Sequence, residues 1–291
     1  MHREAFPLPS NLVEGAARDG RDDWIATLPS VVGELVDRWA LDLGSPFQPG
    51  GQTAWVAPAL SPEHGPVVLK VGWRHFEADD EAEGLRFWDG GGVVQLHESL
   101  ELETCHALLL ERCVPGTPLS ARPEPEQDGV VARILNGLWR DVGSTNPFRT
   151  LQVMCDRWAD SFEQKAIANA TVDPGLARTG AQLFRDLPGT AERAVVLATD
   201  LHAGNILSAE RAPWLAIDPK PFVGDPAYDL LQHMLNCPAR LQSAVGDFAR
   251  RMADLAGVGH ERLLQWLFAR CIVESLQWPE LLNVAGALRP L

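Results

Sequence analysis

The 291-residue sequence lacks the features that would place it in a membrane or hold it together by disulfides. It has no run of about eighteen apolar residues, the length that a membrane-spanning helix requires. Its first residues, Met1 to Glu4, show no apolar core of a signal peptide. The five cysteines are an odd number without a C-x-x-C pair, so we expect reduced and mostly buried thiols. These absences favour a cytoplasmic protein.

Positive charge is also scarce. Lys and Arg total 25 against 39 Asp and Glu, which gives a net charge of −14. A nucleic-acid-binding protein presents a basic face, so we expect no nucleic-acid partner. The acidic balance is compatible with a cationic small molecule, although solubility accounts for most of it.

Lysine in particular is nearly absent. Only Lys70, Lys165 and Lys220 occur beside 22 arginines. A lysine retained against this bias indicates a need for its compact ammonium, which a guanidinium does not imitate. We apply this interpretation to Lys70 and Lys220, and regard Lys165 as chance.

The most informative segment that is present runs from Asp200 to Asp229. Asp200 precedes Asn205 by five residues, and Asp218 follows a short apolar run. A kinase supplies its catalytic base and two magnesium-binding side chains in this order. The pattern predicts a phosphoryl-transfer site in which Asp200 deprotonates an acceptor hydroxyl and Asn205 and Asp218 hold magnesium.

A strand lysine is the second expected part of such a site. Lys70 ends a short apolar run, where a kinase lysine pairs with nucleotide phosphates and with a glutamate of the next helix. We expect Glu83 to be that partner, with Glu81 as the alternative. No lysine follows a glycine, so a Walker A loop is absent from the sequence. The expected nucleotide loop is the glycine turn at Gly51, for which a plain hairpin turn is an equally good interpretation.

The segment from Leu109 to Val114, which includes Glu111 and Cys113, is expected to be the hinge between the lobes that binds adenine through backbone groups. Asp225 before a proline predicts a helix N-cap. We expect structural roles for Asp225 and Asp229, which would hold the catalytic loop by hydrogen bonds.

Two further polar residues lie in the same region. We expect His202 to make a hydrogen bond that stabilises the loop, because no partner ligands for a metal stand at suitable spacing. Lys220 either faces a phosphate or acceptor, or pairs with Asp218 or Asp225.

The apolar periodicity predicts an α+β fold with two lobes, a protein-kinase-like plan. We expect residues 1–114 to form an N-terminal lobe, with a helical extension and a nucleotide-binding sheet. Residues 115–291 would form a larger, mostly helical lobe for catalysis and acceptor binding. The expected helices are 10–17, 22–41 (with Pro29 starting a second segment), 79–88, 128–143, 150–168, 175–187, 225–236, 240–256 and 260–277. The expected strands are 67–71, 93–96, 107–110, 194–197 and 214–217, and residues 50–56 are expected to be a glycine turn that leads into or joins strands.

The sequence resembles the aminoglycoside phosphotransferases, and most of all their streptomycin 6-kinase and hydroxyurea phosphotransferase branch. The likeness is carried by D-L-H-A-G-N-I-L at 200–207, W-L-A-I-D-P-K-P at 214–221 and V-G-D-P at 223–226, and extends to 23–39, 84–90 and 109–112. The family usually has a His or similar residue two positions before the catalytic Asp, and often Gly or Trp directly before it. This chain has Ala198 and Thr199 there.

The resemblance implies a kinase-like fold, ATP and Mg²⁺ as cofactors, and transfer of the γ-phosphoryl group to a hydroxyl of a small molecule. On this mapping Asp200 is the base, Asn205 and Asp218 hold metal, and Lys70 and Glu83 form the ion pair.

We expect the acceptor to be streptomycin or a related aminoglycoside, which the transfer would inactivate. Its guanidinium groups would suit an acidic pocket, to which Glu274 would contribute. Hydroxyurea, a sugar or an amino alcohol are alternative acceptors. A pseudokinase that binds nucleotide without turnover is a third hypothesis; it draws on Ala198 and Thr199, and the presence of all four candidate reactive residues opposes it.

Overall fold

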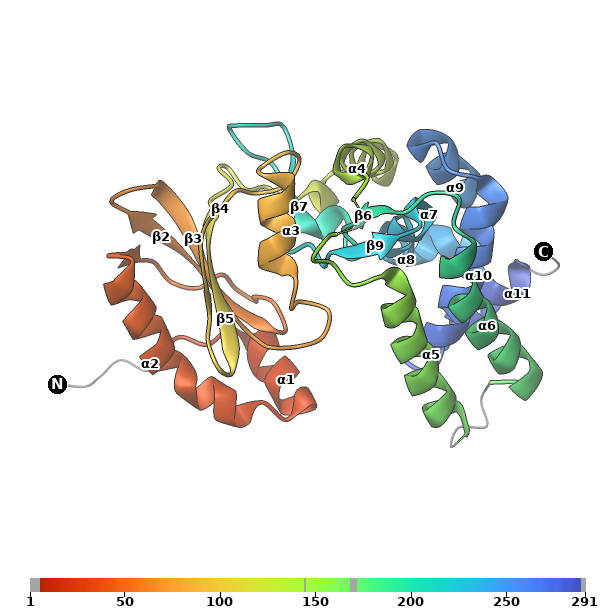
Figure 1. Cartoon of the computed structure of the whole chain (residues 1–291), viewed down its shortest axis with the longest axis horizontal. Helices are drawn as coiled ribbons and strands as arrows, with labels where there is room; N and C mark the ends of the chain where they lie inside the picture. Colours follow the sequence, from red (N-terminus) through yellow and green to blue (C-terminus); the bar gives the residue numbers. More distant parts are fainter. Residues whose placement is uncertain (1–5, 144, 168–171, 289–291) are drawn as a thin grey trace. The chain divides into compact units, whose positions relative to one another are not determined.

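The structure is a computed structural model that describes residues 6–143, 145–167 and 172–288. The chain divides into two compact units, Met1–Gly116 and Thr117–Leu291 (Figure 1). The assignment of nucleotide binding to the first part and acceptor binding to the second stays a prediction.

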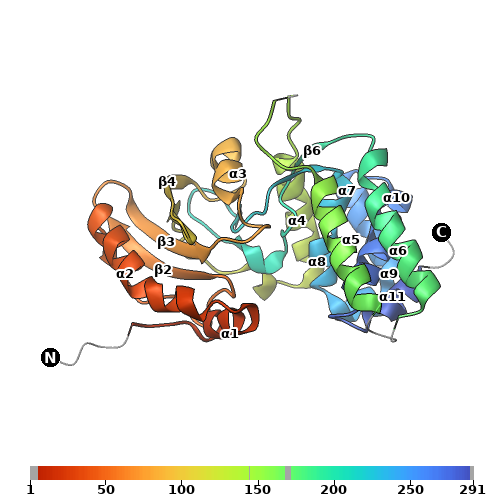
Figure 2. The ribbon, with the colours of Figure 1, turned by 60° about the horizontal axis from the view of Figure 1, so that its bottom comes forward.

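A five-stranded antiparallel sheet forms the centre of the first unit, in the order β1-β2-β3-β5-β4. The strands are β1 (Asp42–Leu43), β2 (Ala54–Ser61), β3 (Gly65–Trp73), β4 (Leu96–Glu101) and β5 (Cys105–Glu111). Two helices, α1 (Ser10–Asp19) and α2 (Asp22–Arg38), lie along one face of this sheet (Figures 1 and 2). Their apolar side chains and alternate residues of β3 form one buried core.

Helix α2 and strand β4 differ from their expected bounds. Helix α2 continues through Pro29, where a new segment was expected. A proline removes one backbone donor, but the buried face of Trp24, Leu28 and Val32 holds the helix on the sheet. The strand expected at 93–96 begins only at Leu96; Val93 and Val94 are buried before it. Strand β4 is a polar edge strand bonded only to β5, so its sequence gives little apolar signal.

Helix α3 (Glu81–Trp88) completes the first unit. Its buried side chains are Glu81, Leu85 and Trp88, which recur at helical spacing. A left-handed Asp89, with φ of 46°, ends the helix directly before Gly90.

The second unit is mainly helical. Its long helices are α4 (Glu124–Leu138), α5 (Leu151–Ile167), α6 (Pro174–Asp186), α9 (Pro238–Ala256) and α10 (His260–Glu274). Shorter ones are α7 (Pro226–Asp229), α8 (Leu231–Leu235) and α11 (Leu281–Ala287), and single 3₁₀ turns occur at Leu119–Ala121, Pro188–Thr190 and Ala203–Asn205. The helix expected over 225–236 is thus divided into α7 and α8, and α11 was not expected.

Helices α5, α6 and α10 lie side by side (Figure 2). The contact between α6 and α10 is close: a Cβ added at Gly180 would lie 2.4 Å from Cγ2 of Ile272. Glycine is therefore required at this position by packing.

Two small antiparallel ladders carry the loop that contains Asp200 and Asn205. Strand β6 (Val195–Leu197) pairs with β9 (Phe222–Gly224), and β7 (Ile206–Leu207) pairs with β8 (Leu215–Ala216). The loop from 198 to 205 leaves β6 and enters β7, and residues 217–221 join β8 to β9. The two ladders therefore bring the two polar segments of the sequence motif together.

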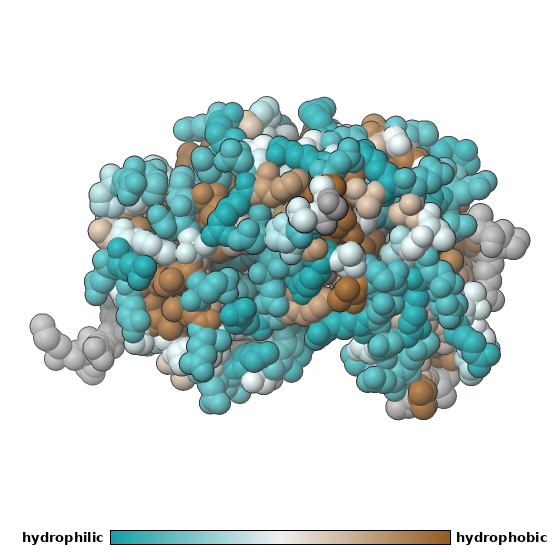
Figure 3. All heavy atoms as spheres, viewed as in Figure 1, coloured by the Kyte–Doolittle hydropathy of each residue, from teal (hydrophilic) through white to brown (hydrophobic). Residues whose placement is uncertain are grey.

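The surface face drawn in Figure 3 is covered mainly by hydrophilic residues, with hydrophobic ones in separate groups. Among the described residues, no helix is both long enough and apolar enough to cross a membrane. All five cysteines are free thiols, and four of them are buried, as the sequence predicts.

Candidate active site

A buried carboxylate anchors the start of the catalytic loop. Asp229 of α7 is fully buried and accepts hydrogen bonds from the backbone N–H groups of Ala198 (2.9 Å) and Thr199 (2.6 Å). It also accepts one from Nε1 of Trp139, at 3.0 Å. Burial raises the pKa of Asp229 to about 6, and these three donors limit the rise. The expectation that Asp229 holds the loop is confirmed.

Thr199 connects the two polar segments. Its φ of 47° lies in the left-handed region, which is uncommon for a β-branched residue. Its hydroxyl donates to the carbonyl of Lys220 at 2.5 Å, and the Lys220 N–H donates to the carbonyl of Ala198 at 2.8 Å. Ala198 and Thr199 therefore form a hydrogen-bonded entry to the loop.

The loop places Asp200 and Asn205 next to each other. Nδ2 of Asn205 donates to the backbone carbonyl of Asp200 at 3.1 Å. This bond uses the amide nitrogen and leaves the amide oxygen of Asn205 as the group suited to a cation. The side chain of Asp200 is 31% exposed, so an acceptor hydroxyl has access to it.

His202 stabilises the turn between these two residues, as expected. Its Nδ1 accepts a hydrogen bond from the N–H of Gly204 at 3.1 Å. Burial lowers the pKa of His202, with smaller contributions from His233 and Lys220 and an opposing one from Asp218. The neutral ring is the form that can accept this bond.

Asp218 stands in the segment between β8 and β9. Its φ of 54° is left-handed, a conformation that Asp tolerates better than most residues. The N–H of Ile217 donates to the carbonyl of Asn205 at 2.9 Å, so the two proposed metal-binding residues are joined through adjacent backbone. Lys220 reaches Oδ1 of Asp218 at 2.5 Å, which confirms one of the two roles expected for this lysine.

The side chains present fit a magnesium site completed by phosphates. Mg²⁺ is typically bound by one or two carboxylates, with substrate phosphates and water filling its octahedron. Asp218 offers a carboxylate and Asn205 an amide oxygen. No cluster of three His, Cys, Asp or Glu side chains that would form an all-protein metal cage occurs in the described ranges. Nothing in the structure tests the two metal ligands directly, and they stay a prediction.

Asp225 caps α7, as predicted, through a hydrogen bond from the N–H of Ala227 at 2.9 Å. The sequence did not indicate its other partners. Nε of Arg262 (2.6 Å) and Nε1 of Trp266 (2.8 Å) donate to its second carboxylate oxygen. Both lie on α10, so Asp225 joins the loop-bearing segment to the helical core.

In the first unit, Lys70 lies within β3 and forms a buried ion pair with Glu81. Its Nζ is 2.7 Å from both carboxylate oxygens, and the side chains are 10% and 1% exposed. The expectation that Glu83 is the partner is wrong. Glu83 is 51% exposed and pairs with Arg86 on the outer side of α3.

The helical repeat explains this correction. At about 100° per residue, Glu81 shares a face with positions three, four and seven residues later, whereas Glu83 lies about 200° away. Leu85 and Trp88 form the apolar face of α3, and their spacing in the sequence is helical. That face identifies Glu81, because it is four residues before Leu85 and seven before Trp88.

The other predicted nucleotide-binding residues stay predictions. Gly51 is exposed in the connection between β1 and β2, beside Gly50, whose carbonyl accepts from Nδ2 of Asn11 at 3.0 Å. Glu111 ends β5, and one of its carboxylate oxygens accepts from the N–H of Gln95 at 2.9 Å. Cys113 follows as a partly exposed thiol.

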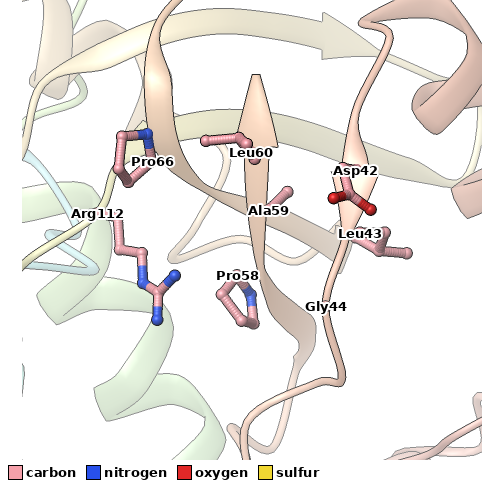
Figure 4. Close-up of a pocket in the computed structure, with 8 residues that line it drawn as sticks. All are labelled: Asp42, Leu43, Gly44, Pro58, Ala59, Leu60, Pro66 and Arg112. Atoms are coloured by element: carbon pink, nitrogen blue, oxygen red, sulfur yellow. The ribbon is translucent and has the colours of Figure 1, made fainter. Parts of the chain in front are cut away.

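A cavity occurs in each of the two units. One, of about 250 Å³, is in the first unit; Figure 4 shows Arg112 and Asp42 on opposite sides of it, with Pro58 and Ala59 between. The second, of about 440 Å³, lies between α5 and α10 and includes Trp158 and Glu274. Glu274 is ion-paired with Arg270. Its charge is therefore compensated, which weakens the expectation that it attracts a cationic acceptor.

The fold and the two charged sites define a class of protein, the protein-kinase-like phosphotransferases, because Lys70, Asp200, Asn205 and Asp218 follow one another in the order that kinases use. Comparison with known proteins gives the family. The model of the aminoglycoside/hydroxyurea antibiotic resistance kinases matches residues 38–280, and the chain belongs to this family.

Its relatives include a streptomycin 6-kinase from Streptomyces griseus, 33% identical over 92% of this chain and 90% of the relative. A hydroxyurea phosphotransferase from Kitasatospora aureofaciens is 31% identical over 93% of this chain and 79% of the relative. Among solved structures, an aminoglycoside phosphotransferase from Streptomyces rimosus in complex with ADP and streptomycin superposes with a TM-score of 0.58. It is 16% identical and covers 89% of this chain and 98% of its own, which confirms the kinase-like fold.

Proposed function

We propose that this protein transfers the γ-phosphoryl group of ATP to a hydroxyl of streptomycin or a related aminoglycoside, and so inactivates it. The observation that carries the proposal is the ordered loop that holds Asp200, Asn205 and Asp218 together in a chain of this family. The streptomycin 6-kinase relatives favour this acceptor.

The reaction would proceed as follows. The acceptor hydroxyl oxygen forms a bond to the γ-phosphorus while the bond to the β–γ bridging oxygen breaks, and that electron pair leaves with ADP. Asp200 orients the hydroxyl and receives its proton. Asn205 and Asp218 would hold magnesium, which when bound neutralises charge on the β- and γ-phosphates.

The first unit would bind the nucleotide. Lys70, fixed by Glu81, would contact the α- and β-phosphates. Gly51 would approach the phosphates in the connection that precedes β2. Backbone groups from Glu111 to Cys113 would pair with adenine. In this proposal residues 1–114 serve the nucleotide and residues 115–291 serve catalysis and the acceptor, in a cytoplasmic protein without a nucleic-acid or membrane partner.

Hydroxyurea is the second candidate acceptor. The observation in its favour is the hydroxyurea phosphotransferase relative, which is nearly as similar as the streptomycin kinases. Hydroxyurea is small and neutral, whereas streptomycin carries guanidinium groups that an acidic protein attracts. The net charge of −14 favours streptomycin.

The test is ADP release by the purified protein with ATP and Mg²⁺, measured across streptomycin, other aminoglycosides, hydroxyurea, simple sugars and amino alcohols. We expect strong stimulation by streptomycin. Stimulation by hydroxyurea or a metabolite alone would retain the reaction and replace the acceptor. ATP binding without ADP release by any member of the panel would contradict the proposal.

The mechanism is tested with Asp200→Ala, and with Asp247→Ala, an exposed aspartate of α9, as control. Loss of a general base lowers turnover by roughly 10²–10⁴-fold. We expect Asp200→Ala to lose activity to this extent with an unchanged thermal midpoint, and Asp247→Ala to retain both. Near-normal turnover in Asp200→Ala would contradict the role of the base.

A further inference from the structure

Lys220 is a buried lysine between the proposed base and the proposed metal-binding carboxylate. Its Nζ is 2.5 Å from Oδ1 of Asp218 and 4.0 Å from Oδ2 of Asp200. The residue is only 8% exposed, although its side chain is long and charged. One ammonium therefore contacts one carboxylate and approaches the other within a single polar site.

The backbone holds this lysine in place. Its N–H donates to the carbonyl of Ala198 at 2.8 Å, and its carbonyl accepts from the Thr199 hydroxyl at 2.5 Å. The same two residues are bound by the carboxylate of Asp229. The entry to the catalytic loop and the residue after the Asp218–Pro219 pair are thus one rigid assembly.

The chemical identity of the residue also points to function. Lysine is used three times in the chain and arginine 22 times, so the residue stands out against the composition. Burying a charge is unfavourable unless it is paired, and an apolar side chain would fill the same space without that penalty. An ammonium is compact and offers three donors in any direction, whereas a guanidinium is a wide planar fork.

We propose that the ammonium of Lys220 donates a hydrogen bond to a non-bridging oxygen of the phosphoryl group during transfer. This inference rests on the proposed function. In the proposed reaction, Asp200 orients the acceptor hydroxyl, and Asp218 would hold the cation that binds the phosphates. The phosphoryl group therefore passes close to both carboxylates, and the ammonium of Lys220 contacts one of them and approaches the other. Fixed donors aimed at the position of developing charge stabilise a transition state with little reorganisation.

The proposed step conserves every atom and charge. The acceptor oxygen bonds to the γ-phosphorus, the bond to the bridging oxygen breaks with its electrons leaving on ADP, and Asp200 takes the hydroxyl proton. Lys220 keeps all of its protons and acts only as a hydrogen-bond donor and a positive charge.

The test compares Lys220→Met, Lys220→Arg and Arg250→Met, the last a change at an exposed arginine of α9 that removes one positive charge and serves as control. For each we would measure kcat, KM for ATP, Mg²⁺ dependence and thermal midpoint, with streptomycin as acceptor. Removing one such donor lowers kcat by roughly 10²–10³-fold. We expect this loss in Lys220→Met, with KM for ATP changed less than about threefold and no recovery at saturating Mg²⁺.

Lys220→Arg keeps the charge and provides a second test if Lys220→Met fails to fold. We expect its kcat to fall by at least about tenfold, because the wider head group moves the donors. Arg250→Met should match the wild type.

Three results would overturn the inference. Full kcat in Lys220→Met, or in Lys220→Arg, would show that the ammonium does not act in the transition state. Recovery of kcat at high Mg²⁺ would show that Lys220 only orients a metal ligand. Tighter Mg²⁺ binding with retained kcat would show that Lys220 only competes with a cation for Asp218. If the wild type itself makes no ADP with any acceptor, the proposed function fails first, which is a separate result.

Discussion

Replacing Glu81 by Gln removes the charge partner of Lys70, and replacing Glu83 by Gln is its matched control two residues away. The structure gives opposite environments to these glutamates. The Lys70–Glu81 pair is bidentate, with both distances at 2.7 Å and side chains 10% and 1% exposed. The Glu83–Arg86 pair is about half exposed on both sides.

The expected magnitudes follow from burial. Breaking a buried ion pair by removing one partner costs about 3–5 kcal/mol, because the other charge stays buried. We expect about 3 kcal/mol for Glu81→Gln, since the amide oxygen still accepts one hydrogen bond. An exposed pair at i,i+3 contributes about 0.3–0.5 kcal/mol, which is the expected effect of Glu83→Gln.

The assay is differential scanning calorimetry of the full chain, followed by ATP titration of the initial rate. At roughly 2–4 °C per kcal/mol, Glu81→Gln should lower the midpoint of the affected transition by about 6–12 °C and Glu83→Gln by about 1–2 °C. Glu81→Gln should also raise KM for ATP, because Lys70 loses its fixed position. A larger effect of Glu83→Gln on either quantity would refute the assignment of the ion pair.

Three further predictions concern the second unit. Burial raises the pKa of Asp229 from 3.8 to about 6, so between these pH values the unfolded chain loses its proton first. As pH rises from about 4 to about 6, the free energy of unfolding of the wild type should therefore fall by about 3 kcal/mol relative to that of Asp229→Asn, with no further fall above pH 6. Chemical unfolding at several pH values would contradict this if the difference between the two proteins stayed constant. Thr199→Val removes the hydrogen bond from the hydroxyl to the carbonyl of Lys220 and keeps a β-branched side chain at this left-handed position. It should lower the free energy of unfolding by about 1–2 kcal/mol, and Thr199→Ser should lower it by less. Equal thermal midpoints for Thr199→Val and the wild type would count against the role of the hydroxyl. Gly180→Ala should destabilise by about 1–3 kcal/mol, since its Cβ would meet Ile272 at 2.4 Å, while Gly246→Ala, with open space around its Cβ, should be neutral or stabilising; a midpoint for Gly180→Ala at or above that of Gly246→Ala would exclude the close approach of α6 and α10.

Much of the catalytic loop could be predicted from the sequence because its reactive groups stand close together in the chain. The spacing of Asp200, Asn205 and Asp218 identified the loop, and the structure orders it through short-range bonds. The N-cap at Asp225 and the loop bond of His202 are local features of the same kind. Their prediction required no knowledge of tertiary packing.

The remaining features depend on contacts between residues that lie far apart in the chain, and the sequence alone does not show which of these residues meet. Asp225 meets Arg262 and Trp266 only because α10 packs beside α7. The left-handed Thr199 donates its hydroxyl to the carbonyl of Lys220, which lies 21 residues later in the chain. The choice between Glu81 and Glu83 is different, because it could be made from the sequence. Glu81 lies at helical spacing from Leu85 and Trp88, so it shares their buried face, and Glu83 does not.

The edge strand β4 shows a further limit of apolar patterning. Its residues are half-buried or exposed, and its partner is β5 alone. The valines before it are buried without belonging to the strand. At this sheet edge, therefore, the burial of a residue does not indicate whether it belongs to the strand, because backbone hydrogen bonds to β5 decide the conformation.

The most direct test of the central claim is mass spectrometry of streptomycin after incubation with the protein, ATP and Mg²⁺. The account predicts a product heavier by one phosphoryl group, formed together with an equal amount of ADP, and no product with Asp200→Ala. Unmodified streptomycin beside a folded, ATP-binding wild-type protein would contradict streptomycin as the acceptor, and equal product from Asp200→Ala would contradict the catalytic loop as described.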